Sequence, residues 1–237
     1  MLEKILIDGA KEYGIELSEL QVKQFMTYKN LLQEWNEKIN LTAITEDEAV
    51  IKKHFIDSIS IIKSGVIGEG ASVIDVGTGA GFPGIPLKII RPDIKLTLLD
   101  SLNKRINFLK TVCSEAGIEG VNCIHMRAED GGRDKTLREK FDIGTARAVA
   151  NMRTLSEYIM PYVKVNGHMV ALKGPIGYEE LDEARNAIGT LGGKAREIVT
   201  TVIPGEDISH NLIIIDKIKA TESRFPRQAK QIKSKPL

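Results

Sequence analysis

The chain has 237 residues, of which 42% are hydrophobic and 27% charged, and its formal net charge is only +1. This composition excludes disordered and fibrous classes, and the near-zero charge means that any nucleic-acid binding must use a local basic patch. The sequence contains neither a signal-peptide pattern nor an apolar run of about 18 residues, and its two cysteines form no CxxC pair. We therefore expect a cytoplasmic protein with one main domain that binds no membrane.

Residues 1–65 are predicted to form a helical extension before any strand begins. Ser18 and Gln21 have the spacing of a capping box, and apolar residues follow at helical intervals. His54 and Asp57 lie three residues apart, which would let them hydrogen-bond to each other on a helix. We favour a structural role for this pair.

A glycine-rich loop follows the first predicted strand, in residues 73–86 (VIDVGTGAGFPGIP). The apolar run before it is typical of a buried parallel strand, and Gly77, Gly79 and Gly81 permit a tight turn whose backbone N–H groups approach a ligand. Asp75 lies inside the strand, where a buried carboxylate requires a polar partner. The pattern predicts a ligand-binding loop at the carboxyl end of this strand.

From residue 71 onward, strand and helix signals alternate. The predicted helices cover residues 104–115, 152–163 and 179–191. The predicted strands after the loop cover residues 95–99, 121–125, 141–146, 168–172, 197–203 and 212–216. Together with the first strand, they predict a three-layer α/β sandwich with seven strands in a mostly parallel sheet.

Two predicted strand ends carry candidate binding residues. Asp100 and Ser101 close the second strand, where an acid commonly accepts hydrogen bonds from ribose hydroxyls. Lys173 follows the fifth strand at the same edge of the sheet. It either contacts the substrate or is a solvated lysine at a strand end, and the sequence favours neither.

The last 21 residues, 217–237, contain seven lysines and arginines against one acid. This surplus predicts a phosphate-binding surface, with a solvated end as the alternative. Arg224 and Arg227, which flank Phe225 and Pro226, are the candidate phosphate contacts together with Lys173.

Several of these segments together resemble one family. They are residues 36–42 (NEKINLT), 54–58 (HFIDS), 77–86 (GTGAGFPGIP), 99–105 (LDSLNKR), 127–129 (RAE), 147–148 (RA) and 225–227 (FPR). The likeness is to the small-subunit ribosomal RNA methyltransferase G family, also called the glucose-inhibited division protein B family. After residue 227 the chain lacks the glycine and proline that the family usually places there.

The resemblance implies a class I, Rossmann-like methyltransferase domain in residues 66–237. It further implies transfer of a methyl group from S-adenosylmethionine to N7 of one guanine in the 530 loop of bacterial 16S ribosomal RNA. By the same resemblance, Gly77 and Phe82 line the cofactor loop, Ala128 and Glu129 flank the adenine, and Arg147 closes the site. The partner would be 16S RNA or the small ribosomal subunit, which makes Lys173, Arg224 and Arg227 the predicted RNA contacts. We expect a monomer.

Guanine N7 carries a free lone pair, so its methylation needs no base. We accordingly name no catalytic residue, and the four histidines have no metal-ligand spacing. Two other interpretations remain open. Residues 79–84 match GxGxxG with Asp100 downstream, as in a nicotinamide-dependent oxidoreductase, and a non-enzymatic RNA-binding or assembly factor could retain the same fold.

Overall fold

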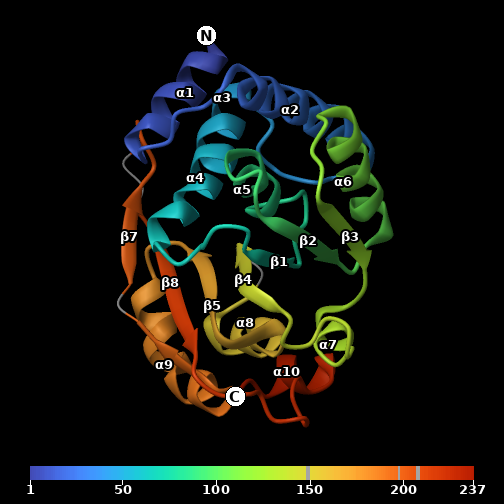
Figure 1. Cartoon of the computed structure of the whole chain (residues 1–237), viewed down its shortest axis with the longest axis vertical. Helices are drawn as coiled ribbons and strands as arrows, with labels where there is room; N and C mark the ends of the chain where they lie inside the picture. Colours follow the sequence, from blue (N-terminus) through green and yellow to red (C-terminus); the bar gives the residue numbers. More distant parts are fainter. Residues whose placement is uncertain (148–149, 197, 207–208) are drawn as a thin grey trace.

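The computed structural model of the chain describes residues 1–147, 150–196, 198–206 and 209–237 (Figure 1). Ala148 and Glu197, which belong to the predicted RA motif and to a predicted strand, lie outside the described residues.

An eight-stranded sheet runs through the middle of the described chain (Figure 1). Its strands are β1 (Ser72–Val76), β2 (Lys95–Asp100), β3 (Val121–His125), β4 (Phe141–Arg147), β5 (Val163–Lys173), β6 (Gly193–Ala195), β7 (Val199–Val202) and β8 (Ser209–Lys217). The order is β3-β2-β1-β4-β5-β8-β6, with β7 also paired to β8. The first five strands are parallel, and β8 runs antiparallel to all three of its neighbours.

The predicted mostly parallel sheet is therefore confirmed. The prediction of seven strands was wrong by one, because β6 and β7 pair with opposite halves of β8 and so divide one edge position between them. The strand order reverses between β1 and β4, the place where open α/β sheets bind ligands beyond the carboxyl ends of their strands.

Helices cover both faces of the sheet, which confirms the three-layer sandwich. The helices are α1 (Leu2–Glu12), α2 (Glu19–Ile39), α3 (Asp47–Val50), α4 (Asp57–Ile59), α5 (Gly84–Ile90), α6 (Asn103–Glu115), α7 (Ala128–Gly131), α8 (Met152–Ile159), α9 (Gly177–Thr190) and α10 (Ala229–Ser234). Figure 1 shows α1–α6 above the sheet and α7–α10 below it. Successive residues of a strand point to opposite faces of the sheet. Val73 thus belongs to the buried cluster on the α2 side, and Ile74 to the cluster on the α8 side.

The N-terminal helices pack directly on this sheet. Ser18 and Gln21 form the predicted capping box at the start of α2. Tyr28, which is fully buried on α2, donates its hydroxyl hydrogen to the carbonyl oxygen of Ala80 in the glycine loop. Its ring lies 5.5 Å from that of Phe82. The division of the chain at residue 65 remains a prediction about folding units, and one buried cluster joins the two parts.

The predicted helix over 152–163 is too long. Helix α8 ends at Ile159, a 3-10 turn (Met160–Tyr162) follows, and β5 begins at Val163 rather than at residue 168. Pro161 lies in that turn, and its missing N–H does not support a continued helix. No helix in the described residues has the length and apolar character to cross a bilayer.

Candidate functional site

The glycine loop between β1 and α5 is built around Asp75. One oxygen of this fully buried carboxylate, Oδ2, accepts hydrogen bonds from Thr78 Oγ1 at 2.7 Å and Gly84 N at 2.9 Å. The polar partner predicted for Asp75 is thus confirmed. Burial raises the pKa of Asp75 to about 7, and the two hydrogen bonds oppose that rise. A Cβ at Gly84 would stand 2.9 Å from the same oxygen, so only glycine lets the loop close onto Asp75.

The N–H groups of the loop are largely used within the protein. Gly77 and Thr78 donate to the Leu99 carbonyl at 2.8 and 3.1 Å, and Gly79 donates to Asp100 Oδ2 at 2.9 Å. Further along the loop, the N–H groups of residues 81 and 82 donate to the Thr78 carbonyl. These amides have partners within the protein, and the expectation that N–H groups of the loop approach a ligand stays a prediction. The glycines of the loop give a backbone without Cβ atoms, and Gly79 adopts the left-handed φ of 62°.

This arrangement argues against the nicotinamide dinucleotide interpretation. Dinucleotide sites bind pyrophosphate with free N–H groups at the start of the helix after the glycine loop. Here the Gly84 N–H, at the start of α5, already binds the buried carboxylate of Asp75. A pyrophosphate would have to compete with that carboxylate for the same donor.

A cavity of about 630 Å³ opens beside the loop, at the carboxyl ends of β1, β2 and β3. The lining includes Gly77 after β1, Ser101 and Leu102 after β2, and Ala128 and Glu129 after β3. Four of the predicted cofactor residues, Gly77, Ser101, Ala128 and Glu129, are therefore brought together. A second hollow of about 560 Å³, between α1 and β7, shares no lining residue with this cavity.

Asp100 and Gly79 are not among the residues that line the cavity. The Asp100 side chain is 2% exposed, and its carboxylate accepts from Gly79 N, from Leu102 N at 2.9 Å and from Arg105 at 3.4 Å. Asp100 therefore ties the loop after β1 to the loop after β2.

Sequence reasoning missed the other half of the cavity. Its wall is formed by Asn151, Thr154, Leu155 and Tyr158 of the α8 region, and by Ala229, Lys233 and Pro236 of the tail. No local motif marks these residues, because they are brought to the cavity by packing between distant segments. For the tail, the surplus of positive charge was the available signal.

Phe82 and Arg147 lie in a polar and aromatic cluster instead of in the cavity lining. The guanidinium of Arg147 stands 4.7 Å from the centre of the Phe82 ring, and the His54 ring stacks on the same phenyl group at 4.6 Å. Arg147 also donates to Asp57 Oδ2 at 2.7 Å and to His54 Nδ1 at 3.0 Å, and Asp57 binds His210 as well. His54 and Asp57 are thus linked through Arg147, and the predicted direct bond between them was wrong.

The charges of this cluster are fixed by their neighbours. Burial and the nearby Arg147 charge lower the pKa of His54 to about 4, so the imidazole is neutral. Because Nδ1 accepts from Arg147, the proton lies on Nε2, which stands 2.7 Å from Thr42 Oγ1. Burial alone would raise the pKa of Asp57, but hydrogen bonds and charge from His210 and Arg147 hold it below its usual value.

Two of the three predicted RNA contacts are occupied inside the protein. The Lys173 side chain is 6% exposed and pairs with Glu180 Oε2 at 2.6 Å, so the alternative of a solvated lysine is wrong, while the substrate contact stays a prediction. Arg227 forms a bidentate salt bridge with the fully buried Glu157 of α8, with distances of 2.9 Å from Nε to Oε1 and 2.6 Å from NH2 to Oε2. Arg224 remains 67% exposed, beside Glu222.

The tail is consequently docked against the rest of the protein on the α8 side of the sheet. Phe225 is buried, Arg138 donates to its carbonyl at 2.8 Å, and Ile232 of α10 is fully buried in the α8-side cluster. Arg153 of α8 donates to the Pro236 carbonyl at 2.8 Å. Figure 1 shows α10 lying beside α7 and α8.

The fold and the site define a class. A sheet of this order, with a glycine loop after β1 and a cavity across the ends of β1 to β3, is the class I methyltransferase fold. Solved structures agree: TYW2 of M. jannaschii in complex with AdoMet has a TM-score of 0.52 at 17% identity, covering 68% of this chain and 77% of that one. The YcgJ protein of Bacillus subtilis has a TM-score of 0.54 at 15% identity, covering 70% and 100%.

The chain belongs to the rRNA small subunit methyltransferase G family, whose model matches residues 21–209. A ribosomal RNA small subunit methyltransferase G of Clostridium perfringens is 59% identical over 224 residues, which is 94% of each chain. A protein of the same name from Alkaliphilus metalliredigens is 52% identical over 233 residues, or 98% of each chain. The predicted family is therefore confirmed.

Proposed function

We propose that this protein transfers a methyl group from S-adenosylmethionine to N7 of one guanine in the 530 loop of 16S ribosomal RNA. The observation that carries the proposal is the cavity at the carboxyl ends of β1, β2 and β3. There Gly77, Ser101, Ala128 and Glu129 line one wall, and residues of the tail line another. Family membership supplies the class of reaction and the small-subunit RNA as substrate.

The residues of the cavity suit the cofactor. Leu102, Met126 and Tyr158 offer apolar surface to an adenine ring, and Ala128 and Glu129 would flank it. Ser101 would face the ribose, with Asp100 holding the loops after β1 and β2 in place around it. Arg147 and Phe82 would support the site from the adjacent cluster.

S-adenosylmethionine supplies a methyl group on a cationic sulfur that a nucleophile can attack. The N7 atom of guanine has a lone pair and no proton, so the protein needs no base and its task is orientation. Holding two reactants in line supplies about 7–11 kcal/mol of the barrier. In A-form RNA the major groove is too narrow for side chains, so a guanine presented by a loop is the reachable target.

We further propose that the enzyme acts as a monomer in the cytoplasm, on 16S RNA or on the small subunit. Among the described residues, no group of three histidine, cysteine or acidic side chains is arranged to hold a metal ion, and the reaction above requires none.

The test is a methyl-transfer assay with labelled S-adenosylmethionine on naked 16S RNA and on small subunits, with mapping of the modified nucleotide. We expect one N7-methylguanine in the 530 loop. Calorimetric titration with S-adenosylmethionine and with NAD separates the enzyme classes. Binding of the methyl donor without any transfer to either substrate would favour a non-enzymatic assembly factor, and modification elsewhere would refute the proposed target.

A further inference from the structure

Helix α10 is fixed at the edge of the cofactor cavity by contacts of the residues before and after it. Before the helix, Arg227 is held by buried Glu157, and after it Arg153 binds the Pro236 carbonyl. Ile232 anchors the helix itself and is fully buried. The basic tail therefore presents its charges in a defined place.

Two lysines of this helix remain exposed, Lys230 and Lys233. Lys233 belongs to the cavity lining, as does Arg127, whose side chain is 70% exposed. Lys230 and Lys233 are three residues apart on one helix and so lie next to each other on its surface. Glu129 is the acid of the same lining, and its side chain is 13% exposed and 3.9 Å from Arg127.

The cofactor does not explain these lysines. S-adenosylmethionine carries one carboxylate, one ammonium and one sulfonium group, and is therefore a net cation. Exposed lysines at its cavity would repel that charge, whereas a polyanion entering beside it would be attracted. Phosphate contacts also position a nucleic acid without reading its sequence, which suits an enzyme that must place one base at a fixed point.

We propose that Lys230 and Lys233 bind the RNA phosphates next to the target guanine, and that the docked helix α10 thereby directs the guanine into the cavity. This inference rests on the proposed function. The RNA-binding part of the tail is then α10, with Arg227 serving as its anchor through Glu157.

The size of the effect follows from counterion release. Each phosphate contact contributes about 0.7–0.9 to the slope of log affinity against log salt. Lys230→Ala/Lys233→Ala should therefore flatten the slope by about 1.4–1.8 and weaken RNA binding by about 25- to 60-fold at 0.1 M salt, with the difference vanishing toward 1 M. Lys230→Arg/Lys233→Arg, which keeps both positive charges, should bind RNA like wild type.

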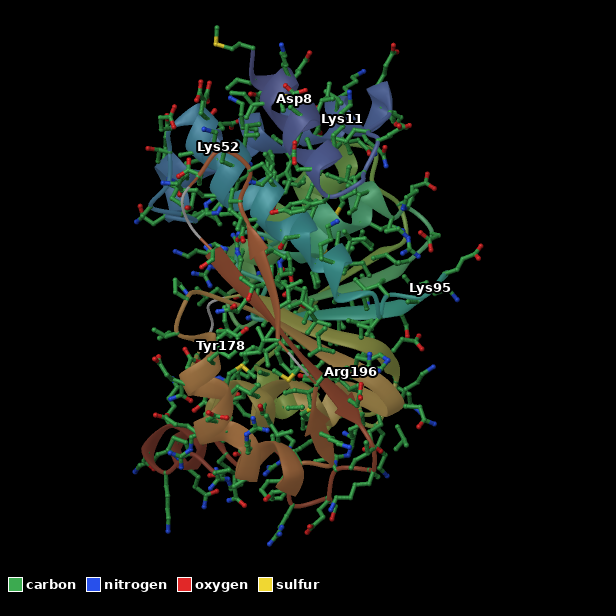
Figure 2. The ribbon with its side chains drawn as sticks, turned by 90° about the vertical axis from the view of Figure 1, so that its left-hand side faces the viewer. Asp8, Lys11, Lys52, Lys95, Tyr178 and Arg196 are labelled. Carbon is green, nitrogen blue, oxygen red and sulfur yellow. The ribbon has the colours of Figure 1, made fainter. Side chains whose placement is uncertain are left out.

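The matched control is Lys95→Ala/Lys140→Ala, which removes the same charge from the opposite edge of the sheet. Lys95 begins β2 and Lys140 precedes β4, and both are exposed. Figure 2 shows Lys95 on the right-hand side of the molecule, away from Tyr178, which follows β5 on the left. This control should leave the salt slope unchanged.

Affinity for 16S RNA, measured at several salt concentrations for all four proteins with cofactor titration alongside, tests the inference. Equal slopes for wild type and Lys230→Ala/Lys233→Ala would overturn it. A loss of cofactor affinity without a change in RNA affinity would overturn it too, and would make Lys233 a cofactor contact. If wild type methylates 16S RNA and the alanine variant binds it normally, this inference alone fails; if wild type methylates no RNA, the proposed function fails.

Discussion

Replacing the two tail arginines should change the stability of the protein to very different extents, although they are three residues apart. Arg227 binds both oxygens of Glu157, whose side chain is fully buried, and its own backbone N–H donates to the same carboxylate at 2.7 Å. Arg227→Ala leaves that carboxylate buried with one backbone donor, a situation that costs about 3–5 kcal/mol. Arg224 and Glu222 are 67% and 58% exposed, and an exposed pair contributes about 0–1 kcal/mol.

Urea denaturation of the two variants measures this contrast directly. We expect Arg227→Ala to lower the free energy of unfolding by about 3–5 kcal/mol, or the melting temperature by about 6–20 °C for a chain of this size. Arg224→Ala should change the free energy of unfolding by no more than about 1 kcal/mol. Because the pair anchors the segment that lines the cavity, Arg227→Ala should also weaken cofactor binding. Equal and small losses for both variants would refute the idea that Glu157 anchors the tail.

Four other changes address the site. Asp100→Ala should weaken the binding of S-adenosylmethionine by about 1.5–3 kcal/mol, because the loops after β1 and β2 lose a charged acceptor. An unchanged affinity in calorimetry would show that Asp100 does not support the site. Gly79→Val should abolish cofactor binding, because a β-branched residue is strained at φ 62°, and normal binding by the folded variant would contradict this. Burial raises the pKa of Asp75 from 3.8 to about 7, so between pH 4 and pH 7 the carboxyl group is protonated in the folded state and ionised in the unfolded state. The free energy of unfolding should therefore fall as the pH rises from 4 to 7. Asp75→Asn should remove that decline in urea denaturation at pH 5 and pH 8, and identical pH profiles would show that Asp75 is not its source. Lys173→Ala should lose up to about 3 kcal/mol of stability, because Glu180 keeps the Met152 N–H as a partner but loses its counter-charge. A variant that melts like wild type but transfers no methyl group would instead support the substrate-contact hypothesis.

The fold was largely predictable because its signals are local. The residues that make up each signal are close together in the sequence. This holds for the glycine loop, for the capping box at Ser18 and for the alternation of apolar strands with helices. Where prediction failed, a neighbour in space decided the outcome. The edge of the sheet is divided between β6 and β7 because each pairs with a different half of β8, and no pattern within either strand reveals that partner.

Prediction of which residues lie together was correct at strand ends, since topology brings the residues after parallel strands to one edge. This is why Gly77, Ser101 and Glu129 could be placed together. It failed for side chains whose role depends on a partner far along the chain. Nothing near Arg227 indicates that Glu157, 70 residues earlier, will take up its charge.

The single tryptophan of the chain offers a spectroscopic consequence of the way the N-terminal helices pack. Trp35 of α2 is half-buried, and its ring lies 5.7 Å from that of Phe108 in α6, so its emission reports on the contact between these two helices. The cavity is lined by other residues, and the aromatic ring among them is that of Tyr158. A change in tryptophan fluorescence on adding S-adenosylmethionine would therefore signal movement of α2 against α6, while the ligand itself stays out of contact with the fluorophore. Since α2 also holds the loop through Tyr28 and Ala80, the same signal would follow the loop during unfolding and give an optical record of when the cofactor site is lost.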